Sequence, residues 1–192
     1  MRSNSHTVSK EDSERARLHQ HQGLSLVPRE SGVYSIGIQL NTPIEVNIRT
    51  IPHTLEVGTY SYTGSALGRS NNLRARILRH LSVEKKVHWH IDQITNSKHA
   101  TVPFVVFSRT SQREECKVNQ SIAEIAQSRV PVPGFGSSDC RSGCESHLLF
   151  LGDGEIVPIV VKAFKNQGLI PKVLEVKRQK GQTEKLILRS TS

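Results

Sequence analysis

The chain has 192 residues, of which 35% are hydrophobic, so it is long enough for one domain with its own core plus polar extensions. It contains no apolar run near the roughly 18 to 20 residues of a membrane span and no apolar core of a secretory signal. A formal net charge of +9 favours a polyanionic partner such as nucleic acid, with simple solubility as the alternative. We expect a soluble intracellular protein without membrane contact, in the cytoplasm or at the nucleoid or nucleus.

Residues 1–26 are polar and have almost no apolar periodicity. Such a segment buries too little apolar surface to offset its ordering entropy, so we expect a disordered arm. Apolar and polar residues then alternate over 34–40 and 44–48, and residues 58–64 have the same strand character. These three segments predict an antiparallel meander. The hydroxyls of Tyr34 and Tyr62 converge if the first and third strands pair.

Apolar residues recur at helical spacing over 73–81, where Arg76 and His80 flank the apolar stripe at positions i and i+4. Residues 88–92 open another short helix, residues 102–107 are typical of a buried strand, and residues 114–126 predict a further helix. Glu115 lies on the apolar face of this last helix. A carboxylate that points inward needs a partner.

The character of the chain changes again after Gly152. We expect a short helix over 156–164 and a hairpin formed by 174–176 and 186–188, and residues 162–192 carry eight Lys and Arg against two Glu. The predicted organisation is therefore a polar arm over 1–26, a folded domain over 27–152 and a basic extension over 153–192. This extension either adds phosphate contacts or stays solvated.

A clustered basic stretch lies between residues 69 and 90, where Glu84 is the single acidic residue. Clustering of cations is the electrostatic signature of a nucleic-acid contact. For the two histidines beside Trp89 we favour binding over catalysis, with simple packing as the alternative. The candidate nucleic-acid-binding residues are Arg69, Arg74, Arg79, Lys85, Lys86, His88 and His90.

Three cysteines make an odd count, which argues against a disulfide framework. The spacing Cys140-x3-Cys144-x2-His147, with Cys116 as a fourth ligand, is compatible with a zinc site of three thiolates and one imidazole. The spacing is loose and Cys116 lies on a predicted helix, so buried free thiols are the default expectation and zinc is the alternative.

Taken in order, several short segments form a recognisable pattern, and the chain resembles the GIY-YIG nuclease family, specifically its Uri-type branch, whose members stand alone or are fused to DNA-repair enzymes. The resemblance covers about residues 31–151. Val33 and Thr63 replace the isoleucines of the family name, and Ser65 stands where repair nucleases often have lysine. The segments that carry the resemblance are 32–34, 60–68, Arg76 with His80, 88–92, 115–116 and 134–140.

The resemblance implies an α+β fold with a small central three-stranded antiparallel sheet flanked by helices. It also implies a DNA endonuclease in which one divalent cation, Mg²⁺ or Mn²⁺, assists phosphodiester hydrolysis, with RNA as an alternative substrate and a DNA-repair protein as a partner. The implied roles are general base or water orientation for Tyr34, its partner for Tyr62, phosphate stabilisation for Arg76, auxiliary proton transfer for His80 and metal ligation for Glu115.

Less specific interpretations accompany each of these residues. Strand tyrosines often only pack a sheet. Arg76 and His80 fit a solvated helix face, and an acidic residue in the position of Glu115 is favoured by the helix dipole. Two functional alternatives follow: a nucleic-acid-binding module that lacks cleavage or needs a partner for it, and a zinc-stabilised structural domain.

Overall fold

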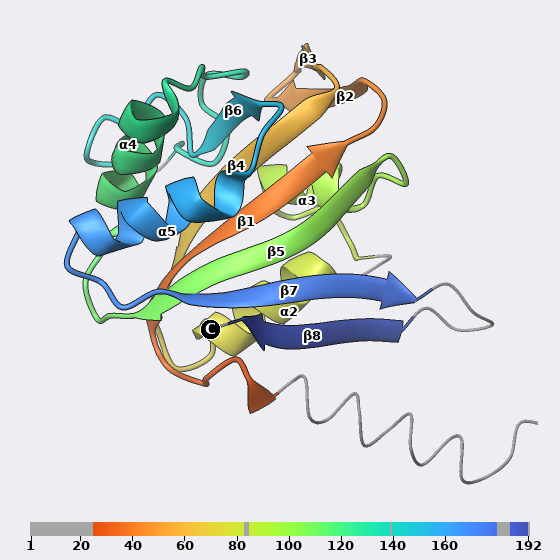
Figure 1. Cartoon of the computed structure of the whole chain (residues 1–192). Coiled ribbons are helices and arrows are strands. Elements are labelled where there is room, and N and C mark those ends of the chain that lie inside the picture. Colours follow the sequence, from red (N-terminus) through yellow and green to blue (C-terminus); the bar gives the residue numbers. More distant parts are fainter. Residues whose placement is uncertain (1–24, 83–84, 139, 180–184, 192) are drawn as a thin grey trace, which may run out of the picture.

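The computed structural model describes residues 25–82, 85–138, 140–179 and 185–191. Their fold is α+β, built on a six-stranded antiparallel sheet with the strand order β6-β4-β1-β5-β7-β8 (Figure 1). The predicted arm over 1–26 lies, except for its last two residues, outside the described residues. The strands of this sheet are β1 (Gly32–Leu40), β4 (Gly58–Ala66), β5 (Ala100–Arg109), β6 (Leu148–Gly152), β7 (Lys172–Gln179) and β8 (Lys185–Thr191).

The neighbouring strands β1 and β4 are buried along almost their whole length. They pair with Tyr34 opposite Gly64 and Ile36 opposite Tyr62, so the two tyrosines of interest lie on neighbouring strands two register positions apart. β5 pairs with the other edge of β1. Because β1 has neighbours on both edges and side chains packed on both faces, its side chains are held in fixed positions.

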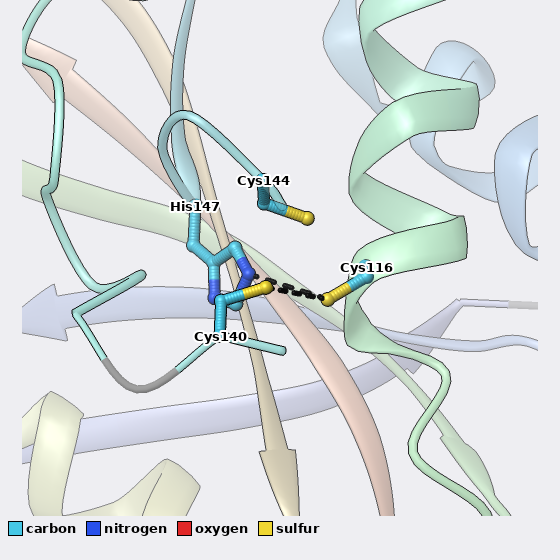
Figure 2. Close-up of side chains that lie close together, drawn as sticks. All are labelled: Cys116, Cys140, Cys144 and His147. Carbon is cyan, nitrogen blue, oxygen red and sulfur yellow. Dashed lines mark hydrogen bonds between the residues drawn. The ribbon is translucent and has the colours of Figure 1, made fainter. Parts of the chain in front are cut away.

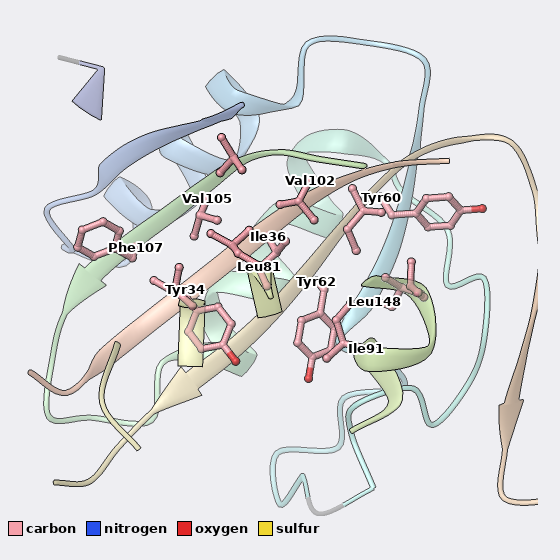
Figure 3. Packing of buried hydrophobic residues seen from close by; sticks show 14 of the residues in the cluster. Tyr34, Ile36, Tyr60, Tyr62, Leu81, Ile91, Val102, Val105, Phe107 and Leu148 are labelled. Carbon is pink, nitrogen blue, oxygen red and sulfur yellow. The ribbon is translucent and has the colours of Figure 1, made fainter. Parts of the chain in front are cut away.

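Helices cover both faces of the sheet (Figure 1). On one face, α2 (Leu73–Leu81) and α3 (His90–Thr95) bury Leu73, Ile77 and Ile91 in the same cluster as Tyr34 and Tyr62 (Figure 3). The other face is covered by α4 (Glu115–Ala126) and α5 (Ile156–Asn166), whose apolar residues at helical spacing form a second cluster with β5 and β6. A separate two-stranded sheet contains β2 (Ile44–Ile48) and β3 (Ile51–Leu55).

The expectation of a small three-stranded sheet is wrong. The segment 44–48 leaves the main sheet and pairs only with β3, because alternate residues of β2 stay exposed and do not fit a strand buried on both faces. The main sheet instead grows through β5, β7 and β8 on one side of β1 and through β6 beyond β4. These are pairings between distant segments, which local apolar patterns do not specify.

The predicted boundary at residue 152 falls between β6 and α5. Leu149 of β6 and Val160 of α5 belong to one buried cluster, and β7 is hydrogen bonded to β5. The predicted helix over 156–164 and the hairpin of β7 and β8 are confirmed, and they belong to the same layered structure as the preceding residues. In the described part of the chain, no helix is long and apolar enough to cross a membrane.

Candidate active site

The phenol of Tyr34 and the imidazole of His80 meet beneath the sheet. The Tyr34 hydroxyl lies 2.8 Å from Nε2 of His80, and both side chains are almost completely buried. Burial raises the pKa of Tyr34 well above its usual range, and the neighbouring Tyr62 acts in the same direction. Burial also lowers the pKa of His80 to about 3, against the opposing effect of Asp92. At neutral pH the phenol is therefore protonated and the imidazole uncharged.

Asp92 organises the residues around this pair. One of its oxygens, Oδ2, accepts hydrogen bonds from Arg79 at 2.6 Å and from the backbone N–H groups of His88 and Trp89 at 3.0 Å each. The carboxylate is fully buried at the start of α3. Its other oxygen, Oδ1, lies 4.0 Å from Nδ1 of His80. Asp92 therefore ties α2 to α3 through Arg79 and places its second oxygen close to His80.

Arg76 stacks on Trp89, with its guanidinium carbon 4.2 Å from the centre of the indole ring. Its Nε is buried and has no hydrogen-bond partner among the described residues. Stacking holds the plane of the guanidinium and leaves N–H groups at its edge for an anion. Arg79 differs, because Asp92 already neutralises it.

Tyr62 enters the same site from β4, where its ring lies 6.2 Å from that of His80. The hydroxyls of Tyr34 and Tyr62 point in the same direction, whereas the hydroxyl of Tyr60 points in another direction and donates to the carbonyl of Glu56 (Figure 3). Glycine makes room for Tyr34, because a Cβ at Gly64 would lie 2.7 Å from its hydroxyl oxygen.

Glu115 is the first residue of α4 and is 7% exposed. Its Oε1 lies 3.8 Å from the exposed Arg113, and the described residues offer no hydrogen-bond partner to its buried Oε2. A carboxylate oxygen that is shielded from water and unpaired is unfavourable unless a cation binds there.

These residues line one open pocket of about 360 Å³. It brings together all five predicted catalytic side chains, which come from β1, β4, α2 and α4. Arg113 and Arg141 also line the pocket, so its walls combine cations with one carboxylate. The predicted catalytic residues in the lining are Tyr34, Tyr62, Arg76, His80 and Glu115.

The predicted nucleic-acid-binding residues fall into two groups. Three of them hold the protein together: Arg74 donates to the carbonyl of Val27 at 2.6 Å, Arg79 binds Asp92, and Lys85 donates to the carbonyl of His80 at 3.1 Å. The side chains of the other four are more accessible to a ligand. Arg69, Lys86 and His88 are exposed, and His88 and His90 line the pocket, although His90 also accepts a hydrogen bond from the backbone of Gly136.

A second cluster borders the pocket (Figure 2). Sγ of Cys116 lies 3.3 Å from Sγ of Cys140 and 3.6 Å from Nε2 of His147. The ligand atoms of these three residues and Cys144 all lie within 4.8 Å of one another. In a tetrahedral site with Zn–S bonds of about 2.3 Å, neighbouring sulfurs are about 3.8 Å apart. The default expectation of separate free thiols is therefore replaced by a Cys3His cluster that can hold a metal ion.

Two features were not predicted from the sequence. Asp92 appeared only as part of a motif, although an acidic residue in the first turn of a helix, beside a histidine-rich segment, is a usable signal for a buried hydrogen-bonding centre. Arg113 and Arg141 have no such signal, because only the fold brings them to the pocket.

The model of a family described as Domain of unknown function DUF123 matches residues 33–169, and the chain belongs to this family. That family is not the GIY-YIG family, so the GIY-YIG assignment is wrong. The matched region includes all five predicted catalytic residues and extends past the predicted boundary at 152 into α5. Searches of curated proteins and of solved structures give no match.

Proposed function

We propose that this protein hydrolyses phosphodiester bonds in DNA with the help of a divalent cation. The observation that carries the proposal is the Tyr34–His80 hydrogen bond at a pocket that is also lined by Glu115, whose buried Oε2 has no hydrogen-bond partner among the described residues. A proton acceptor, an anion-binding guanidinium and a cation ligand around one space are the groups that phosphodiester hydrolysis requires. The net charge of +9 supports a polyanionic substrate.

Proton transfer would run from water through Tyr34 to His80. Because burial raises its pKa, Tyr34 stays protonated and is not a free phenolate. It therefore acts as a relay: it passes its own proton to Nε2 of His80 as it accepts a proton from the water. The water oxygen forms a bond to phosphorus as the bond to the leaving oxygen breaks with its electron pair. The His80 imidazolium later releases its proton to solvent, and a solvent proton neutralises the leaving oxygen.

Arg76 would bind the phosphate as its charge redistributes. Its planar guanidinium is held over the Trp89 ring, and its Nε–H has no partner among the described residues. Arginine keeps its charge at every relevant pH and can hold two oxygens at once. Tyr62, whose ring lies 6.2 Å from that of His80, would orient the attacking water from β4.

Glu115 fits one carboxylate ligand of Mg²⁺ or Mn²⁺. Its buried Oε2 has no partner in the described structure, and Mg²⁺ is often bound through one or two carboxylates together with water and phosphate oxygens. When bound, such a cation supplies positive charge to the transferring phosphate. Arg113 is too exposed to replace it, since its side chain is 75% exposed.

The Cys3His cluster fits zinc, because three thiolates and one imidazole are a ligand set of structural zinc sites. Burial and the adjacent sulfurs raise the pKa of the Cys144 thiol, and a cation is what would allow several thiolates to coexist there. Cys116 follows Glu115 directly in α4, while His147 directly precedes β6. Zinc would therefore fasten the start of α4 to the strand beside Tyr62.

The test is cleavage of supercoiled plasmid, linear duplex, single-stranded DNA and RNA with Mg²⁺ or Mn²⁺. The proposal expects metal-dependent cleavage of at least one DNA form and loss of it in Glu115→Gln. Arg109→Lys is the control, because Arg109 is in an exposed ion pair with Glu30 and is not among the residues that line the pocket. Salt-dependent DNA binding without turnover on every form would favour a nucleic-acid-binding module instead.

A further inference from the structure

Two buried polar atoms face each other behind the Tyr34–His80 pair. Nδ1 of His80 and Oδ1 of Asp92 are 4.0 Å apart, and their side chains are 1% and 0% exposed. Neither atom has a hydrogen-bond partner within the described part of the chain. A buried nitrogen and a buried carboxylate oxygen without partners are each costly, and closing the 4.0 Å gap between them would satisfy both.

The position of the ring proton decides whether both atoms are satisfied. A neutral imidazole carries one N–H. With the proton on Nδ1, the N–H points to a carboxylate oxygen and Nε2 accepts from the Tyr34 hydroxyl 2.8 Å away. With the proton on Nε2, a lone pair of His80 Nδ1 faces a lone pair of Asp92 Oδ1, which is unfavourable. The first tautomer is therefore strongly favoured.

Asp92 has no freedom to turn away from His80. Its Oδ2 is fixed by three donors, the Arg79 guanidinium and the backbone N–H groups of His88 and Trp89. These bonds determine the plane of the carboxylate and direct Oδ1 at the imidazole. The resulting chain runs from Arg79 through Asp92 and His80 to Tyr34.

We propose that Asp92 is a positioning residue for the hydrolase: it keeps the proton of His80 on Nδ1 and thereby leaves Nε2 open to the Tyr34 proton. This inference rests on the proposed function for its catalytic consequence. As Nε2 takes up that proton, the negative charge of Asp92 also stabilises the imidazolium that forms. The same division of roles between an aspartate and a histidine occurs in serine proteases.

Asp92→Asn is the sharpest test, because it changes the donor pattern at nearly constant shape. The asparagine oxygen should occupy the Oδ2 position, where three donors converge, and its NH2 group then faces His80. Nδ1 must become an acceptor, so the ring proton moves to Nε2 and the Tyr34 proton loses its acceptor. We expect cleavage to fall roughly 10³-fold or more, as a comparable aspartate-to-asparagine change lowers turnover about 10⁴-fold in a protease.

The tautomer is measured directly by nitrogen NMR of histidine-labelled protein, with His80→Gln used to assign the His80 signals. Wild type should be protonated on Nδ1, and Asp92→Asn on Nε2. Asp153→Asn, an exposed aspartate between β6 and α5, should keep the wild-type tautomer and cleavage rate. Wild-type protein protonated on Nε2 would overturn the proposal, whether or not Asp92→Asn folds.

A double-mutant cycle supplies the second readout. If Asp92 acts through His80, Asp92→Asn should have little further effect on cleavage in a His80→Gln background. Equal fold-losses in both backgrounds would overturn the positioning role. The tautomer measurement does not depend on cleavage. Absence of cleavage in wild type would therefore count against the proposed function, while the spectra would still test whether Asp92 sets the tautomer of His80.

Discussion

The hydroxyl of Tyr34 lies 2.8 Å from Nε2 of His80, although 46 positions separate the two residues in the chain. β1 supplies the tyrosine and α2 supplies the histidine, and their contact is buried between the sheet and the helices. Burial keeps the imidazole uncharged by lowering its pKa to about 3. The lone pair of a neutral histidine is thus available next to the phenol at neutral pH.

The depressed pKa of His80 predicts how stability depends on pH. The folded pKa of about 3 lies below the ordinary value of 6.5, so the unfolded chain binds a proton that the folded chain lacks between these values. This residue's contribution to the free energy of unfolding should therefore fall as pH decreases from about 6.5 towards 3, by up to about 1.4 kcal/mol per pH unit. Urea unfolding between pH 7 and 4.5 measures the slope.

The comparison for this measurement is between two histidine variants. His80→Gln should show a shallower pH dependence than wild type, because the titrating group is gone. His53→Gln in the separate two-stranded sheet removes an imidazole outside the site. A slope in His80→Gln equal to that of wild type would mean that His80 is not the residue responsible.

Gly64 should be intolerant of a side chain. An added Cβ would lie 2.7 Å from the hydroxyl oxygen of Tyr34 and 2.9 Å from Cζ, so Gly64→Ala must displace the phenol or the strand. We expect a loss of about 1–3 kcal/mol in unfolding free energy and a marked loss of DNA cleavage. Gly154→Ala, where an added Cβ would meet open space, should leave both close to wild type. Equal behaviour of the two variants would contradict the packing argument.

The Cys3His cluster should retain zinc through purification without added metal. Elemental analysis should give roughly one equivalent per chain, and Cys144→Ser should lower it and reduce thermal stability. Glu115→Gln should keep its zinc, which would separate this cluster from the proposed magnesium site. A wild-type zinc content below about a tenth of an equivalent would argue for free thiols.

DNA cleavage should depend on both the charge and the planar shape of the Arg76 side chain. Arg76→Lys keeps the charge but loses the planar fork stacked on Trp89, so cleavage should fall by about 10²-fold with a similar salt dependence of DNA binding. Arg76→Gln should also reduce the slope of log affinity against log salt by about one. Unchanged cleavage in Arg76→Lys would show that the guanidinium does not contact the reacting phosphate.

The sequence specified the local elements and the pocket residues better than the sheet. Alternating and helical patterns located β1, β4, α2 and α4, and the order of Tyr34, Tyr62, Arg76, His80 and Glu115 indicated which side chains to bring together. The size of the sheet depends on pairing between β5, β7 and β8, which local periodicity does not determine.

The same limit explains the errors at the site. Cys116 lies in the first turn of α4, whereas the other three ligands lie in the segment that precedes β6, so their convergence depends on the packing of α4 beside β6. Asp92 was passed over because its importance comes from three donors that surround one oxygen. The resemblance that pointed to the pocket residues also led to the wrong family and to too small a sheet.

The most direct test of the central claim is the single-turnover rate of DNA cleavage by wild type and Tyr34→Phe, in Mg²⁺ or Mn²⁺. Phenylalanine keeps the buried ring and removes only the hydroxyl that binds His80. We predict cleavage by wild type and a rate at least about 10²-fold lower in Tyr34→Phe, with unchanged DNA affinity. Equal rates in the two proteins would contradict the proposed role of this hydroxyl.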